Sequence, residues 1–195
     1  MEKEQFENEN YEKVLIPVSI LGATLYCIFL MIGFGSMFGY IFHVIWGGLL
    51  HHLLYMNKIL FFGLVLFCIL AHEGIHALFA GIYSVNGFKS IKLGIAGFKM
   101  LFSPYCHCRE ALTIKQFLIV SYMPTVILGI APVTIALLTG KIDFLIIGIL
   151  MIGGGGGDLL YCVRLMKEKQ DDYLYELPND ENLMGLVVYR KKMSS

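Results

Sequence analysis

The chain has 195 residues, of which 57% are hydrophobic and 15% charged, and its formal net charge is zero. An average soluble domain carries about 25% charged residues, so this composition indicates an integral membrane protein. The length allows one compact unit rather than two domains. With no excess of basic residues to attract phosphates, nucleic acid is excluded as a partner, and the lipid bilayer is the expected surrounding.

The apolar residues fall into four blocks. These are Val14–Met56, Ile59–Tyr83, Gln116–Leu138 and Phe144–Leu165. Since about 20 apolar residues cross a hydrocarbon layer of ~30 Å, each of the last three blocks predicts one transmembrane helix. The first block is too long for one straight helix. It predicts either one span over about residues 14–34 followed by a re-entrant or interfacial piece, or two spans.

Charged residues orient these spans. With four spans and the N-terminus inside, every Lys and Arg except Lys58 and Lys141 lies inside, as the positive-inside rule asks. Five spans with the N-terminus outside fit that rule less well. Residues 1–13 are acidic and lack the pattern of a signal peptide, so we interpret them as a cytoplasmic N-tail. Both arrangements place the loop after the second block and the tail of residues 167–195 in the cytoplasm.

The loop between the second and third blocks contains a β pattern. Apolar side chains at Ile91, Leu93 and Ile95 alternate with smaller or polar ones, which predicts a strand. Residues 98–106 can supply a second strand, and Leu183–Tyr189 is a further candidate. The predicted fold is an all-α membrane protein of four or five transmembrane helices with a small cytoplasmic β-hairpin. Its transmembrane part is a single domain over residues 14–166.

The second block contains the run HEGIH at residues 72–76. On a helix, His72 and His76 share one face, and two imidazoles at that spacing can hold one Zn²⁺ at ~2.0–2.1 Å each. Glu73 between them can take a proton from a water molecule that the metal activates and deliver it to a leaving amine. A charged acid in mid-bilayer costs about 2.5–3.5 kcal/mol and is kept there mainly for function. The run therefore predicts a zinc-hydrolase site within the membrane.

A tetrahedral catalytic zinc takes a third protein ligand. Apart from Glu73, the acid well inside a predicted span is Asp158, which lies at nearly the same depth as the two histidines. We expect Asp158 to complete the ligand set. The glycines of residues 153–157 either unwind the helix or allow very close packing, and either outcome can bring Asp158 to the metal.

Other polar residues in the chain are weaker candidates. Pro124 is expected to bend the third span and free a backbone carbonyl, which must then face protein or a watery cavity. Cys106 and Cys108 flank His107, but no second Cys/His pair follows at zinc-finger spacing. His107 and Glu110 stay unassigned near the mouth of the site. A separate group is interpreted as interfacial on the far side of the membrane, namely His43, His51 and His52.

Three stretches carry a family resemblance. They are HEGIHAL from residue 72, SPYCHCREALTIKQFLIVSYMP ending at Pro124, and GGDLLYCVRL leading into YELPNDENLMGLVVY. Together they resemble the zincin peptidase family that carries domain of unknown function 3267, found mostly in bacteria, and are more distantly similar to the site-2 proteases. The resemblance implies that His72, His76 and Asp158 bind zinc and that Glu73 is the base. Unlike the site-2 proteases, this chain has glycines before the aspartate and Leu159 after it.

The leading hypothesis is a zinc-dependent membrane-embedded peptidase. Its substrate would be a membrane-anchored peptide or protein, paired as a strand against the predicted hairpin. The expected location is a bacterial cell membrane, crossed several times, with the C-terminus in the cytoplasm. One alternative is a non-catalytic membrane binding or immunity protein with a degenerate metal site. Another is a small transporter with a proton path through intramembrane acids and histidines, although that leaves the ligand spacing unexplained.

Overall fold

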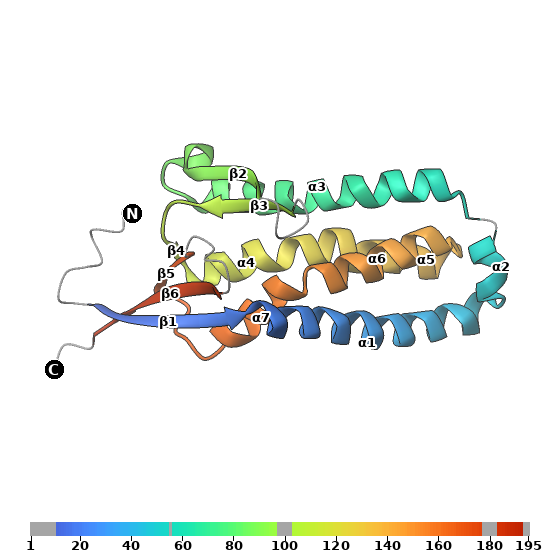
Figure 1. Ribbon diagram of the computed structural model, residues 1–195, viewed down its shortest axis with the longest axis horizontal. Helices are drawn as coiled ribbons and strands as arrows, with labels where there is room; N and C mark the ends of the chain where they lie inside the picture. The colour runs from blue at the N-terminus through green and yellow to red at the C-terminus, as the bar shows by residue number, and fades with distance from the viewer. Residues whose placement is uncertain (1–10, 55, 97–102, 177–182, 193–195) are drawn as a thin grey trace.

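The computed structural model describes residues 11–54, 56–96, 103–176 and 183–192. Figure 1 shows an elongated molecule in which a bundle of helices carries small β-sheets at one end and the short helix α2 (Leu49–Leu54) at the other. Residues 11–19 and 183–191, the first and last strands of the described structure, both lie at the sheet end. The helices run alternately away from the sheets and back toward them, so the loops gather at two opposite ends.

The helices follow the predicted apolar blocks. The second block forms α3 (Lys58–Tyr83). The third forms one continuous rod made of α4 (Ile114–Pro124), the π-helical turn η4 (Thr125–Ile130) and α5 (Ala131–Thr139). The fourth forms α6 (Ile142–Gly154) and α7 (Gly156–Leu165), which meet at a 48° bend. Among the described residues, three helices are long and apolar enough to cross a membrane, or four if the bent pair is one span.

The first apolar block differs from the prediction. Its first residues belong to the strand β1 (Tyr11–Ser19), and helix α1 spans Ile20–Trp46. The expected start of a span at Val14 is therefore wrong. The apolar run passes from strand to helix without a polar break, and the boundary is set by a cap: the side chain of Ser19 accepts a 3.0 Å hydrogen bond from the backbone N–H of Gly22. One long helix followed by α2 matches the one-span reading of this block.

Two antiparallel sheets cover the sheet end of the bundle. The predicted strand around residues 91–95 is confirmed as β2 (Ile91–Ala96), which pairs with β3 (Ser103–Cys108) to form a hairpin. Of the second predicted strand, residues 98–102 lie outside the described residues and residues 103–106 belong to β3. The predicted strand at Leu183–Tyr189 is confirmed within β6 (Leu183–Lys191). It lies in a four-stranded sheet of order β1-β6-β5-β4, with β4 at Leu112–Thr113 and β5 at Tyr173–Glu176. The predicted class is therefore confirmed in part: the fold is mostly helical and has the hairpin, but a second sheet is present that the all-α class did not include.

The pairing of β1 with β6 decides the parity of the spans. It runs from Tyr11 opposite Lys191 to Ser19 opposite Leu183. Strands that pair must lie on the same side of any membrane that the helices cross. The described structure is therefore compatible with an even number of crossings, and the five-span arrangement is excluded. Pro17 fits this place because β1 is an edge strand, where a missing N–H costs no ladder bond.

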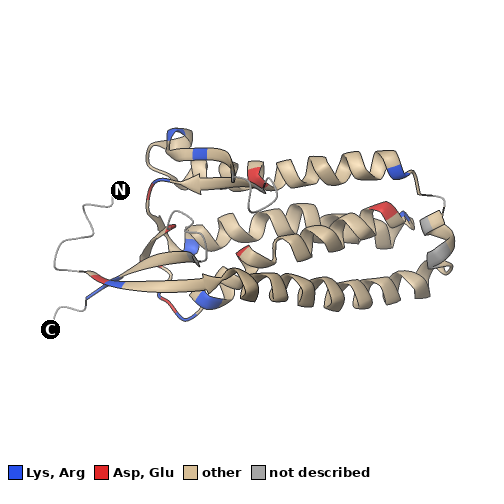
Figure 2. Cartoon of the chain, viewed as in Figure 1, with Lys and Arg blue, Asp and Glu red and all other residues tan. Residues whose placement is uncertain are grey.

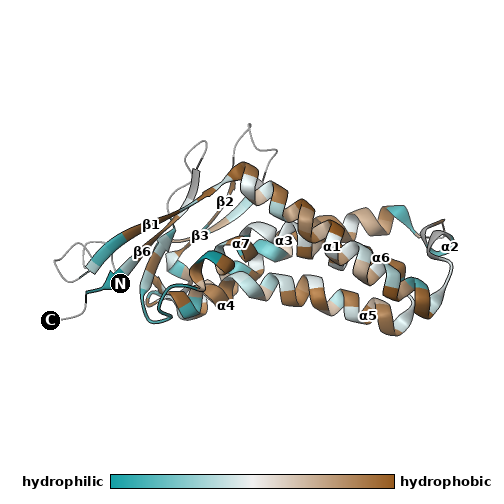
Figure 3. Ribbon diagram, turned by 90° about the horizontal axis from the view of Figure 1, so that it is seen from below, coloured by the Kyte–Doolittle hydropathy of each residue, from teal (hydrophilic) through white to brown (hydrophobic). Residues whose placement is uncertain are grey.

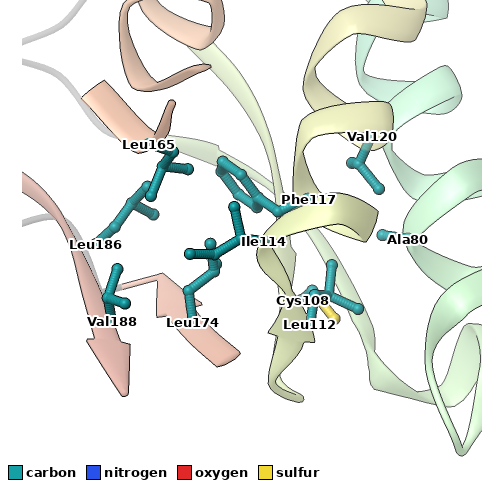
Figure 4. Packing of buried hydrophobic residues seen from close by; sticks show 10 residues of the cluster. All are labelled: Ala80, Cys108, Leu112, Ile114, Phe117, Val120, Leu165, Leu174, Leu186 and Val188. Atoms are coloured by element: carbon teal, nitrogen blue, oxygen red, sulfur yellow. The ribbon is translucent and has the colours of Figure 1, made fainter. Parts of the chain in front are cut away.

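A compact core joins the sheets to the bundle. Figure 4 shows buried side chains of β5 and β6 meeting those of α4 and α7, with Ile114, Leu165 and Val188 fully buried. Arg164 of α7 adds a 3.0 Å hydrogen bond to the carbonyl of Pro17 in β1. These contacts fix α7, which carries Asp158, relative to the sheet.

The outer surface of the bundle is apolar. Leu21 and Ile32 on α1 and Phe62 on α3 are each about two-thirds exposed, and hydrophobic residues follow the helices along their length in Figure 3. Charged residues gather mainly at the sheet end in Figure 2. Such a surface is suited to lipid rather than to water.

Candidate metal centre

The two histidines of the HEGIH run lie on one face of α3. Their rings stand 4.8 Å apart, centre to centre, and at a steep angle to each other. Their Nε2 atoms are 3.1 Å apart. The one-turn spacing of the sequence therefore gives two nitrogen atoms aimed at a common point, as the helical periodicity predicts.

Asp158 reaches the same point from another helix. It stands in the first turn of α7, just after the bend. Its Oδ2 atom lies 3.2 Å from His72 Nε2 and 3.3 Å from His76 Nε2. The His72 and His76 side chains are 13% and 12% exposed, and that of Asp158 is 31% exposed. The three residues that the sequence placed at one depth thus lie together, although Asp158 is 86 positions from His72 and 82 from His76 in the chain.

The glycine run makes this approach possible. Gly155 occupies the break between α6 and α7, and a Cβ atom there would lie 2.9 Å from the Thr125 hydroxyl and 3.4 Å from Cε1 of His72. At Gly156, a Cβ atom would lie 2.9 Å from the Cα atom of Cys27 in α1. Both expected effects of the glycines are therefore present. The helix breaks, and it also packs against its neighbours at distances that a side chain would forbid.

The hydrogen bonds leave the centre rich in acceptors. Nδ1 of His76 lies 3.1 Å from the backbone carbonyl of Val120, and it must carry a proton to donate there. In the neutral ring, Nε2 then bears a lone pair. This lone pair faces the second imidazole and the Asp158 carboxylate. A single proton can bridge only two such atoms, whereas one metal ion can satisfy all three.

The spacing of these atoms fits a small tetrahedral ion. Ligands at ~2.0–2.1 Å in tetrahedral geometry lie about 3.3 Å from one another. The three separations observed, 3.1, 3.2 and 3.3 Å, are close to that value. Two imidazole nitrogens and one carboxylate oxygen are also a ligand set that zinc accepts. Among the described residues, this is the group of His, Cys, Asp and Glu side chains arranged to hold a metal ion.

Glu73 lies beside this group and is turned toward the hairpin. It follows His72 on α3, and its carboxylate interacts electrostatically with both histidines and with Asp158. It also accepts a hydrogen bond from the backbone N–H of Cys106 in β3. The carboxylate is therefore held between the metal-binding atoms and the outer edge of a strand, where a general base for peptide hydrolysis would be useful.

Sequence reasoning missed Glu176 as a neighbour of the centre. Nδ1 of His107 in β3 lies 3.0 Å from Oε2 of Glu176 at the end of β5, and Glu176 also interacts electrostatically with His76. The signal in the sequence was weak, because β5 has only four residues. The pair links the hairpin to the larger sheet near the centre.

The other candidates have different surroundings. Glu110 is buried and accepts hydrogen bonds from Asn86, from Ser90 and from the backbone N–H of Val85, so it anchors the loop after α3. Although burial raises the pKa of Glu110, the bonds from Ser90 and Asn86 outweigh it and lower that pKa below its ordinary value. The hydroxyl of Ser84 lies 3.2 Å from the Cys108 thiol.

The cysteines of the hairpin and the remaining histidines do not join the centre. Alternation along β3 places Cys106 and Cys108 on one face and His107 on the other, so these three do not converge. Burial raises the pKa of Cys106 to about 12, which disfavours the thiolate that a metal would need. His43, His51 and His52 lie near the end of α1 and on α2, at the opposite end of the bundle.

A polar group without a partner lies next to the centre. The Thr125 hydroxyl is buried and has no hydrogen bond within the described structure. By contrast, the hydroxyls of Thr24, Thr134 and Thr139 each bond the carbonyl four residues earlier. Thr125 opens the π-helical turn, a distortion often found at functional sites.

Comparison with known families agrees with this geometry. The family model described as "Putative zincin peptidase", for domain of unknown function 3267, matches residues 65–173. The matched range is more than half of the chain and contains all three converging residues. No curated protein and no solved structure matches the chain significantly.

Proposed function

Because the chain belongs to the zincin peptidase family of domain of unknown function 3267, we propose that it is a zinc-dependent peptidase embedded in a membrane. The observation that carries the proposal is the convergence of two imidazole nitrogens and one carboxylate oxygen within 3.3 Å. One shared zinc ion would satisfy all three acceptors. Zinc ligands and a base in the order His, Glu, two spacers and His are the arrangement used for metal-assisted hydrolysis.

Each residue has a role in this proposal. His72, His76 and Asp158 hold the ion. When bound, zinc would polarise the scissile carbonyl and make water acidic enough to attack at neutral pH. Glu73 takes the proton of the attacking water and passes it to the leaving amine. The backbone N–H of Cys106 orients the Glu73 carboxylate and so keeps the base in place between proton transfers.

The proposed substrate is a membrane-anchored peptide or protein. β3 is paired on one side with β2, and its Cys106 N–H points toward Glu73. An extended segment added along this outer edge would pass the base, since main-chain hydrogen bonds align such a segment with the strand. The apolar outer surface of α1 and α3 supports insertion in a membrane. The proposed location is the cell membrane, with the sheets on the cytoplasmic side, because the distribution of Lys and Arg favours that orientation.

Two measurements test this function. The purified protein is expected to bind about one zinc per chain, and His76→Ala to bind much less. The protein is then reconstituted in liposomes with a mixture of synthetic single-span peptides, and products are identified by mass spectrometry. Glu73→Gln should keep the zinc and lose the cleavage. If the parent cleaves no better than Glu73→Gln while both hold zinc, the peptidase is refuted in favour of a non-catalytic metal-binding membrane protein.

A further inference from the structure

A proline stands one helical turn from the carbonyl that His76 uses. Pro124 lies at the end of α4 with helical backbone angles, φ −59° and ψ −42°. In an α-helix, the N–H of each residue donates to the carbonyl four residues earlier. Proline has no N–H, so the residue at position 124 cannot donate to the carbonyl of Val120.

The carbonyl of Val120 accepts from a side chain instead. Nδ1 of His76 on α3 lies 3.1 Å from this oxygen. Val120 and Pro124 are both buried, so water is not well placed to donate a hydrogen bond to the Val120 carbonyl. We propose that Pro124 is a positioning residue, which leaves the Val120 carbonyl available to orient the His76 ring and to keep a proton on Nδ1. The consequence for metal affinity rests on the proposed function.

The position of the proline, four residues after Val120, distinguishes this role from simple bending of the helix. A proline at position 123 or 125 would leave a different carbonyl without its helical donor. The Val120 carbonyl, which His76 uses, would then take part in an ordinary helical hydrogen bond. With the proton on Nδ1, the lone pair of His76 Nε2 points to His72 and Asp158, 3.1 and 3.3 Å away. Partners of this kind fix the tautomer and ring orientation of metal-binding histidines. Pro124 thus makes one hydrogen-bond acceptor, the Val120 carbonyl, available at one place in the continuous rod.

Pro132 provides a matched control in the same rod. It lies at the start of α5, beyond the π-helical turn. The turn before it includes Leu128, which packs against the apolar cluster that contains Phe61 and Cys68. Like Pro124→Ala, Pro132→Ala adds a backbone N–H and changes the flexibility of the rod. The added N–H does not face the Val120 carbonyl that His76 uses.

The test compares Pro124→Ala and Pro132→Ala in the full-length protein in detergent. An alanine N–H at position 124 would compete with His76 for Val120, because sharing one oxygen weakens both bonds. We expect zinc affinity, measured by competition with a chelator, to fall about tenfold in Pro124→Ala, the lower end of the range for losing such a partner. Pro132→Ala should bind zinc as the parent does. Thermal unfolding of both variants shows that they fold.

The ring N–H signal gives a readout that does not need metal. Proton NMR of the metal-free protein should show a slowly exchanging His76 Nδ1–H, assigned by its loss in His76→Ala. In Pro124→Ala this signal should move upfield and exchange faster. An unchanged signal and unchanged zinc affinity in Pro124→Ala would refute the proposal, as would an equal loss in Pro132→Ala. If the parent binds no zinc, the proposed function fails while the NMR comparison still decides the role of Pro124.

Discussion

Nε2 of His72 lies 3.2 Å from Oδ2 of Asp158, although the two residues are 86 positions apart in the chain. A cation shared by these two atoms and by Nε2 of His76 would satisfy all three at once. Asp158→Asn keeps the shape of the side chain but removes its charge. Zinc affinity should fall at least tenfold, since a neutral amide is a poor zinc ligand. Undiminished zinc binding, measured by chelator competition, would remove Asp158 from the ligand set.

Removal of the metal should lower stability. A ligand that binds only the folded state stabilises it by about 2.7 kcal/mol when present at about 100 times its Kd. We expect a chelator to lower the melting temperature of the parent in detergent and to leave that of His76→Ala unchanged. A chelator effect of equal size in the two proteins would show that zinc stabilises the fold at another place.

The glycine run offers a sharp steric comparison. A Cβ atom at Gly155 would lie 2.9 Å from the Thr125 hydroxyl and 3.2 Å from the Met151 carbonyl, whereas one at Gly154 would meet nothing within 4 Å. Gly155→Ala should therefore displace α7 and weaken zinc binding, with a cost of about 1–3 kcal/mol in unfolding free energy. Gly154→Ala should leave both nearly unchanged. Similar behaviour of the two variants would contradict the close approach at the bend.

Glu110 predicts a dependence of stability on pH. Its pKa is lowered in the fold, mainly because the donors from Ser90 and Asn86 outweigh burial. Its contribution is therefore fully present above its unfolded pKa of about 4.3 and is lost as the pH falls through the lower folded value. Glu110→Gln should cost about 2 kcal/mol at pH 7, and less near pH 3. Denaturant titrations at both pH values measure this, with the exposed Glu12→Gln as the control. If Glu110→Gln lost the same unfolding free energy at pH 3 as at pH 7, the predicted role of the Glu110 charge would be contradicted.

Much of this molecule could be read from the sequence. Continuous apolar runs located α3 and the later helices, and one-turn spacing with equal depth brought His72, His76 and Asp158 together. The alternation at residues 91–95 located β2. Signals that depend on distant partners were missing. The strand character of Val14–Ser19 is indistinguishable from the start of an apolar span, because its partner β6 lies some 170 residues later. β5 is too short to show a period.

The arrangement of the ends predicts membrane topology. Since β1 pairs with β6, tags fused to the N-terminus and the C-terminus should face the same side. In sealed vesicles, an added protease should digest both tags or neither. Digestion of one tag and protection of the other would contradict four crossings.

The nine-residue pairing of β1 with β6 also sets an order of events during synthesis. β1 is synthesised first, but its neighbour in the sheet is β6, which is synthesised last. β1 can therefore pair only after β6 has left the ribosome. All four helical segments are made before this sheet can close, and contacts so distant in sequence form slowly. A chain halted at residue 176 would already contain every residue of the metal centre, yet its first strand would have no partner. Completion of the last strand is thus the step that joins the two ends of the molecule.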